Sequence, residues 1–228
     1  MTNLIPVRLF SFLVLFSLIG LSSCKNKEEV LPDASYIRFI NASPTLGTYN
    51  IYLDDKIVNT VPIPFGGTVS YKPYIFGNHT VKYTTATNSE SILTKQITLT
   101  GNQIHSAYLV DKDTKMDLLL FIDDASVTST TKAFVKFINL SPDAPALSLD
   151  IKAGANLVKD KTYKLGSPFI QIDPKTYDFD IKDANGVVKT TLTGVEMVAG
   201  RYYTIISRGM LTPGTTDQSF SAQSIINN

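Results

Sequence analysis

Three aspartates lie close together near the middle of the chain, at Asp111, Asp113 and Asp117. Carboxylates at nearly alternate positions of one loop are the ligands that Ca²⁺ takes from a protein. The rest of the calcium pattern is missing, because Lys115 stands at a ligand position, no glycine follows at the bend, and the twelfth position is Ile122 instead of Glu. The segment therefore predicts a solvated hairpin, and no metal site is expected.

The chain has two histidines, His79 and His105, and neither has a Cys or Glu at the spacing of a zinc site. The sequence also lacks the Gly-x-Ser-x-Gly nucleophile elbow, the phosphate-binding P-loop and the dinucleotide fingerprint. These patterns predict no catalytic residue and no cofactor. An enzyme is therefore not expected, and a hydrolase whose site assembles from residues distant in sequence is the alternative.

An aromatic stretch is the candidate binding site. Tyr71, Tyr74 and Phe76 lie together in the first half of the chain. Exposed rings supply a large contact area at small entropic cost, so they would suit a peptide or a sugar, although the chain has no Trp for a glycan platform. The hypothesis requires at least two of the three rings to face solvent on one side, and packing of the rings into a core or loop is the alternative. The comparable stretch of the second half carries Gln171, Asp173 and Pro174.

Cys24 is the single cysteine, and it closes the sequence Leu-Ser-Ser-Cys at 21–24. A basic residue and then an uncharged, mostly apolar run at 9–23 precede it, which is the plan of an export signal. This run is short for a span, since a hydrocarbon core of ~30 Å takes about 20 residues. The tetrapeptide resembles the lipobox of bacterial lipoproteins, and the resemblance implies cleavage of a signal peptide, 1–23, and lipid on Cys24. An uncleaved signal anchor is the alternative.

Residues 24–33 are polar and contain one proline, so they predict a flexible tether behind the lipid. Within them, Lys27-Glu28-Glu29 resembles the surface-export signal of Bacteroidota lipoproteins, and an outer-membrane lipoprotein is expected, either surface-exposed or facing the periplasm. The chain has 21 Lys and Arg against 20 Asp and Glu, a net charge of +1 that excludes a strongly basic nucleic-acid surface. Its expected partners are the membrane, through lipid, and an unidentified protein or glycan.

The body of the chain is an internal duplication. The segment Tyr36–Pro44 returns as Phe134–Pro142, 98 positions later, with Phe, Ile, Asn, Ser and Pro unchanged. Two repeats are therefore expected, at 34–124 and 132–228. A linker of small residues at 125–131 joins them.

Each repeat shows the alternation of half-buried strands. Ile37 and Phe39 alternate with more polar neighbours, as do Leu149 and Ile151 in the second repeat. Short strands with turn residues about every 8–12 positions are typical of an immunoglobulin-like sandwich. We therefore expect an all-β chain of two tandem immunoglobulin-like antiparallel β-sandwiches, with Phe39 and Phe137 in equivalent places in their cores.

Two segments carry a resemblance to a known family, Phe39-Ile40-Asn41-Ala42-Ser43-Pro44 and Phe137–Pro145. Their Asn, Ser and Pro residues predict a turn capped by side chains after the strand. An opening strand with the pattern aromatic-aliphatic-basic-Phe-Ile-Asn, followed by Ser-Pro and an alternating strand, resembles the family catalogued as domain of unknown function 4397. The resemblance covers both repeats and so nearly the whole mature chain. The resemblance implies a secreted or lipid-anchored bacterial protein with immunoglobulin-like domains, and it brings no catalytic residue.

These observations favour a lipid-anchored protein of the cell envelope that acts as a non-catalytic binding, adhesion or assembly module. Fold alone does not assign an activity, so the alternatives of a passive spacer and a hydrolase stay open. A binding module is expected to expose an apolar or aromatic patch. A hydrolase is expected to show a pocket with perturbed carboxylates.

Overall fold

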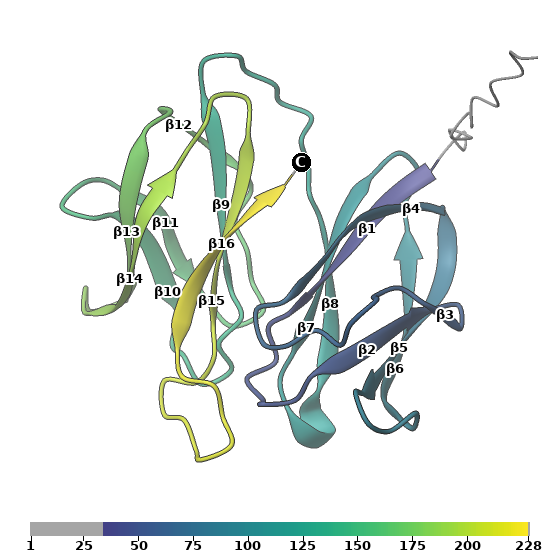
Figure 1. Cartoon of the computed structure of the whole chain (residues 1–228). Helices are drawn as coiled ribbons and strands as arrows, with labels where there is room; N and C mark the ends of the chain where they lie inside the picture. Colours follow the sequence, from purple (N-terminus) through teal and green to yellow (C-terminus); the bar gives the residue numbers. More distant parts are fainter. Residues whose placement is uncertain (1–33, 228) are drawn as a thin grey trace, which may run out of the picture. The chain divides into compact units, whose positions relative to one another are not determined.

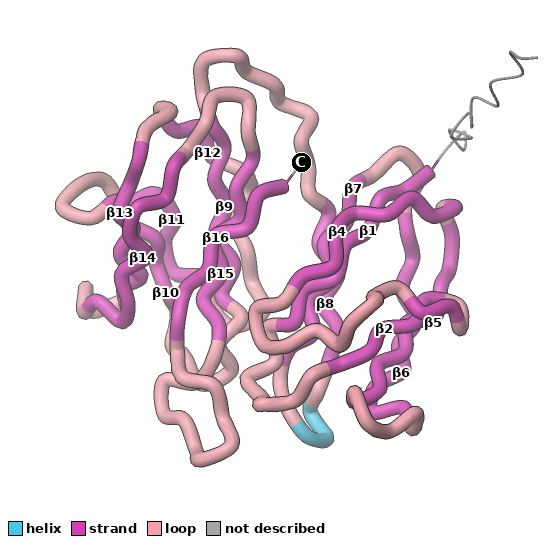
Figure 2. Tube along the Cα trace, viewed as in Figure 1, coloured by secondary structure: helices cyan, strands magenta, loops and turns pink. Residues whose placement is uncertain are grey.

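The computed structural model describes residues 34–227 (Figure 1). Cys24, the predicted signal peptide at 1–23 and the predicted tether at 24–33 lie outside the described residues. Within them, strands and their connecting loops make up nearly all of the chain, with one short 3₁₀ helix at Asp113–Lys115 (Figure 2).

The first repeat has eight strands in two four-stranded sheets. The strands are β1 Ala34–Asn41, β2 Tyr49–Leu53, β3 Lys56–Ile57, β4 Thr68–Ile75, β5 Gly77–Thr85, β6 Ser91–Leu99, β7 Ile104–Val110 and β8 Asp117–Ile122. One sheet has the order β4-β1-β7-β8 and is called the β1 sheet; the other has the order β3-β2-β5-β6 and is called the β2 sheet.

The second repeat has the same plan. Its strands are β9 Ala133–Asn139, β10 Leu147–Ile151, β11 Asn156–Lys161, β12 Ile170–Ile172, β13 Thr176–Asp183, β14 Val188–Glu196, β15 Tyr202–Arg208 and β16 Ser221–Asn227. The order β12-β9-β15-β16 forms the β9 sheet, and the order β11-β10-β13-β14 forms the β10 sheet. The all-β fold of two sandwiches is confirmed, and the two repeats share one topology.

The pairing of β1 with β7 departs from the expected antiparallel pattern. These strands run parallel, as do β9 and β15, whereas the other ladders are antiparallel. Five strands intervene between β1 and β7, so no tight turn fixes their relative direction.

Each sandwich buries a core between its two sheets. Phe39 of β1 and Phe137 of β9 are 0% exposed, at equivalent places in the two cores. Full burial of a Phe side chain contributes about 1.5–3 kcal/mol. The predicted strand register of both opening strands is confirmed by these two rings.

The turn after each opening strand is the predicted capped turn. The Ser43 amide donates to Asn41 Oδ1 at 3.1 Å, and the Ser141 amide donates to Asn139 Oδ1 at the same distance. Both asparagines are fully buried, so their side chains satisfy backbone groups that water cannot reach.

A third core joins the two repeats. Ile40 and Tyr108 on the outer face of the β1 sheet belong to one buried cluster with Ile138, Ile206 and Ile225 of the β9 sheet. The opening strands are therefore buried on both faces, one against their own sandwich and one against the other repeat. The simple alternation of a half-buried strand does not describe them, because the outer face is also covered.

Candidate functional site

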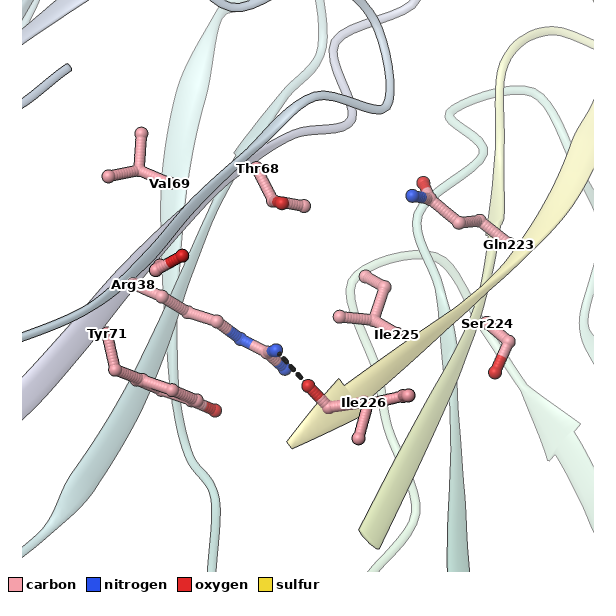
Figure 3. Close-up of a pocket in the computed structure, with 9 residues that line it drawn as sticks. Arg38, Thr68, Val69, Tyr71, Gln223, Ser224, Ile225 and Ile226 are labelled. Atoms are coloured by element: carbon pink, nitrogen blue, oxygen red, sulfur yellow. Dashed lines mark hydrogen bonds between the residues drawn. The ribbon is translucent and has the colours of Figure 1, made fainter. Parts of the chain in front are cut away.

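A groove of about 480 Å³ lies between the edge strands β4 and β16 (Figure 3). Thr68–Tyr71 and Gln223–Ile226 line its two sides, together with Arg38 of β1. The Gln223 side-chain amide donates to the Gly66 carbonyl oxygen at 3.0 Å and ties the two sides together. We call this the Arg38 groove, and its volume is within the range of about 300–1,000 Å³ that small ligands occupy.

The local structure of β1 and β4 positions Arg38. Its neighbours Ile37 and Phe39 point into the first core, so Arg38 points out of that sandwich. A β-bulge in the β1–β4 ladder places Ser70 and Tyr71 both opposite Arg38. The guanidinium carbon lies 4.7 Å from the centroid of the Tyr71 ring, a cation–π contact.

The guanidinium is only partly satisfied. Arg38 Nε donates to Ser106 Oγ at 2.7 Å, and Nη1 donates to the Ile226 carbonyl oxygen of β16 at 2.8 Å (Figure 3). Among residues 34–227, Nη2 has no hydrogen-bond partner, although Arg38 is only 4% exposed. A buried donor without an acceptor costs on the order of 1–3 kcal/mol, more when it is charged.

Asp123 is the carboxylate of this region. It accepts hydrogen bonds from Ser106 and Lys136, and from the Tyr71 hydroxyl at 2.7 Å. The side chains of Lys136 and Asp123 are 4% and 2% exposed, and they form an ion pair between the two repeats. The buried polar cluster of Arg38, Tyr71, Ser106, Asp123 and Lys136 thus holds two cations and one carboxylate.

Burial shifts the protonation equilibria of this cluster. Desolvation lowers the pKa of the Lys136 ammonium, although its pairing with Asp123 opposes the shift. Desolvation and then the neighbouring Asp123 carboxylate raise the pKa of the Tyr71 hydroxyl, which therefore stays protonated and serves as a donor.

The second repeat carries an equivalent pair of a cation and a ring. Lys136 lies 98 positions after Arg38, and Phe169 lies 98 positions after Tyr71. The Lys136 Nζ atom is 4.7 Å from the centroid of the Phe169 ring. The duplication therefore produced the same contact twice, once in each repeat.

The counterpart of Asp123 is a neutral residue. Ser106 donates to Asp123 at the end of β8, and Thr204, 98 positions later, donates to Asn227 Oδ1 at 2.8 Å at the end of β16. The registers of β7 with β8 and of β15 with β16 place these residues alike. Where the first repeat supplies a carboxylate, the second supplies an amide.

A second hollow, of about 320 Å³, surrounds the Lys136–Phe169 contact. We call it the aromatic groove, because Phe134 and Tyr202 stack in its wall with ring centroids 4.3 Å apart. Asp124 also lines it. The two grooves are thus built on equivalent positions but differ in charge and in side-chain chemistry.

The structure does not bring Tyr71, Tyr74 and Phe76 onto one surface. Tyr71 faces Arg38 and Asp123, Tyr74 packs against the first core on the opposite face of β4, and only Phe76 is exposed, at 52%. The expected surface with two or more of these rings facing solvent is therefore corrected. The spacing is the physical reason, since Tyr71 and Tyr74 are three residues apart on β4 and side chains alternate between the two faces of a strand.

The sequence patterns did not predict the buried polar cluster. Arg38 and Lys136 occupy matching positions in strands that are otherwise strongly apolar, and this was the available signal. Asp123 and Asn227 gave none, because their roles depend on contacts between strands far apart in the chain.

The carboxylates of the hairpin at 111–117 hold a lysine. Lys164 Nζ lies 3.1 Å from Asp111 Oδ2 and 3.1 Å from Asp117 Oδ2. At the other candidate, His79 Nδ1 lies 2.5 Å from Asp54 Oδ2. The part of the chain from 34 to 227 contains no cluster of three or more side chains suited to a metal ion. Nor does this part include a helix with the length and apolar character needed to cross a bilayer.

Comparison with known proteins identifies a family. Residues 35–150 match the family described as Domain of unknown function (DUF4397), a match that takes in the first repeat and the first two strands of the second. No protein with a curated description matches the sequence.

Two solved structures show a weak likeness. One is the Bacillus anthracis TIE protein, with 15% identity and a TM-score of 0.25, over 77% of this chain and 34% of that chain. This chain therefore spans about a third of its length. The other is a DUF3823 family protein from Bacteroides ovatus, with 10% identity and a TM-score of 0.20, over 73% of this chain and 98% of that one.

Proposed function

Since the chain belongs to this family of unknown function, we propose from its own site that it is a lipid-anchored, non-catalytic binding module of the cell envelope, and that the Arg38 groove is its binding site. The observation that supports the proposal is the buried Arg38 at this groove, whose Nη2 has no acceptor among residues 34–227. Buried charges normally have partners, so an unpaired donor at a groove suggests a ligand.

The lining of the groove favours binding over catalysis. Its nine residues include one charged side chain, Arg38, and no carboxylate, histidine or cysteine. A serine or threonine hydroxyl is a weak nucleophile until a neighbouring base activates it, and the lining supplies no carboxylate or histidine as that base. Hydroxyls of Thr68, Ser70 and Ser224 and apolar walls of Val69 and Ile225 instead suit the recognition of a small or extended ligand.

The binding test is a chemical-shift survey of the full chain against small organic acids, amines, neutral sugars and short peptides. Signals of Thr68–Tyr71 and Gln223–Ile226 should shift and saturate with at least one of these compounds. The aromatic groove serves as the internal comparison. Shifts confined to that groove, or no saturable shift with any compound at millimolar concentration, would overturn the assignment of the site.

A passive spacer is the second candidate, and the contacts between the repeats favour it. The third core, the Lys136–Asp123 pair and the Lys112–Asp217 pair at 2.6 Å all connect the two sandwiches. A spacer benefits from joined domains but has no use for the unsatisfied guanidinium. The chemical-shift survey therefore separates the two functions.

Anchoring is tested at Cys24. Changing Cys24 to Ala should abolish lipidation and leave an uncleaved or soluble product, because the lipid is attached to the thiol and two or three acyl chains are needed for stable anchoring. Mass spectrometry of the mature N-terminus measures it. A parent chain that begins anywhere other than at an acylated Cys24 would contradict the lipoprotein assignment.

Protease accessibility measures which side of the outer membrane the anchored protein faces. Protease added to intact cells should remove the domains if they are displayed outside, and should spare them until the outer membrane is opened if they face the periplasm.

A further inference from the structure

We propose that the Arg38 groove binds a carboxylate group attached to an apolar body, with Arg38 as the residue that receives the carboxylate. The inference rests on the proposed binding function and names its ligand class. A small organic acid and the C-terminus of a peptide both present this chemistry.

The first argument is a missing counter-charge. In the second repeat, Lys136 is neutralised by Asp123 across the contact between the repeats. Arg38 is the equivalent cation of the first repeat, and the residue equivalent to Asp123 is Asn227. An amide carries no charge, so the duplication leaves one of its two equivalent cations without the carboxylate that the other has.

The second argument is a pair of unused donors. Within residues 34–227, both Arg38 Nη2 and Asn227 Nδ2 are buried and have no hydrogen-bond partner. Asn227 is 8% exposed, and its Oδ1 atom is occupied by the Thr204 hydroxyl. Arg38 and Asn227 occupy the positions equivalent to Lys136 and Asp123, and each keeps a buried N–H group for which an anion would be a charged acceptor.

The third argument is the way Arg38 is held. Its Nη1 atom donates to the Ile226 carbonyl, a neutral acceptor on an edge strand (Figure 3). A carboxylate accepts two parallel N–H bonds from a guanidinium and forms the stronger, charge-assisted contact. The bound carboxylate would therefore replace this carbonyl as the acceptor and also satisfy Nη2.

The walls of the groove select what is attached to the carboxylate. Val69, Ile225 and Ile226 offer apolar contacts, and no acidic side chain lines the groove to repel an anion. The aromatic groove is a poorer anion site, because Asp124 lines it and Asp123 already neutralises its Lys136.

The test is a titration of the full chain with matched acids and amides, read from the signals of Thr68–Tyr71. The probes are 3-phenylpropionate against 3-phenylpropionamide, and acetyl-Ala-Ala-Leu as the free acid against its C-terminal amide. Inorganic phosphate is the third arm. Each acid should bind about tenfold or more tightly than its amide, the difference expected for hydrogen bonds to a charged group. Comparing the two acids shows whether a peptide or a small acid is preferred.

The decisive variant is Asn227→Asp, which restores the carboxylate that the repeat symmetry predicts. It keeps the shape of the side chain and the acceptor for Thr204, so the fold should be retained. Binding of both acids should fall at least about tenfold, because the new carboxylate neutralises Arg38. Arg38→Gln should also abolish the preference for acid over amide, with retention of fold checked by circular dichroism. Thr193→Asp, an exposed position on β14 in the β10 sheet, adds the same charge outside the lining of the groove and should leave binding unchanged.

Several results would overturn the assignment of a carboxylate ligand. Equal binding of acid and amide at the groove would leave the proposed binding function standing and remove this ligand class, as would tighter binding of phosphate. If Asn227→Asp binds both acids with unchanged affinity, the absence of a carboxylate at position 227 does not explain binding at Arg38. Absence of any groove shift with every probe would instead contradict the binding function itself.

Discussion

Replacing Asp123 with Asn should lower the free energy of unfolding by about 3–5 kcal/mol, the usual cost of removing one partner from a buried ion pair. Asp123 is the carboxylate that accepts bonds from Lys136, Ser106 and Tyr71, and it lies with Arg38 in the same buried cluster. Its loss leaves two buried cations without an opposite charge. Urea denaturation of the full chain, followed by circular dichroism, measures the effect.

The pH dependence of this variant distinguishes a charge effect from a loss of packing. Without Asp123, burial and then the charge of Arg38 act on Lys136 and hold its pKa further below the value of about 10.4 of an unfolded chain. The native state then binds fewer protons than the unfolded state between those two pKa values, so the stability of the variant should rise with pH in that window. A deficit that stays constant with pH would contradict the electrostatic explanation.

Two companion variants complete the Asp123 experiment. Asp173→Asn removes the carboxylate of the exposed pair with Lys132, whose side chains are 70% and 43% exposed, and should leave the unfolding midpoint unchanged. The double variant Asp123→Leu, Lys136→Met replaces the buried pair with apolar side chains and should recover most of the lost stability. A double variant as unstable as Asp123→Asn would show that Asp123 acts mainly by holding Ser106 and Tyr71.

Replacing Phe39 with Ala should also cost about 3–5 kcal/mol, as should Phe137→Ala, because both rings are fully buried and truncation leaves a cavity. A loss of this size approaches the whole stability of a typical domain. The full chain is the proper sample, since isolated halves would expose the third core that joins the repeats. Urea denaturation again provides the measurement.

Phe76→Ala is the matched control for the Phe39 variant. This ring is 52% exposed, and its removal should change the free energy of unfolding by no more than about 0.5 kcal/mol. A similarly small effect for Phe39→Ala would mean that its ring faces solvent and that the strand register is displaced by one residue.

Much of the fold followed from the sequence because it depends on local periodicity and on the duplication. The alternation around Phe39 and Phe137 predicted which side chains enter the two cores, and a buried ring tolerates no other register. The repeated Asn-x-Ser predicted the capped turns at Asn41 and Asn139, since an Asn side chain bonds its own backbone two residues on.

The candidate site was predictable only in part. Tyr71 was selected for its aromatic type, and it does line the Arg38 groove, but it lies against Arg38 and Asp123 instead of forming a surface with Tyr74 and Phe76. Its counterpart Phe169 was overlooked in favour of Gln171, although the offset of 98 positions leads to Phe169. The spacing of three residues between Tyr71 and Tyr74 already indicates opposite faces of one strand, and this signal was overlooked.

The sequence by itself determined a duplicated all-β chain, the inward faces of its strands, its capped turns and the membership of a family of unknown function. Each of these depends on the types and spacing of residues within a single repeat. Only the tertiary structure decided that the outer faces of the two repeats share a core, that Lys136 meets Asp123, and that Arg38 lies at a groove without a carboxylate of its own. The physical reason is that these contacts join residues as far apart as Arg38 and Ile226, and their energies depend on burial and charge, which no pattern of neighbouring residues records.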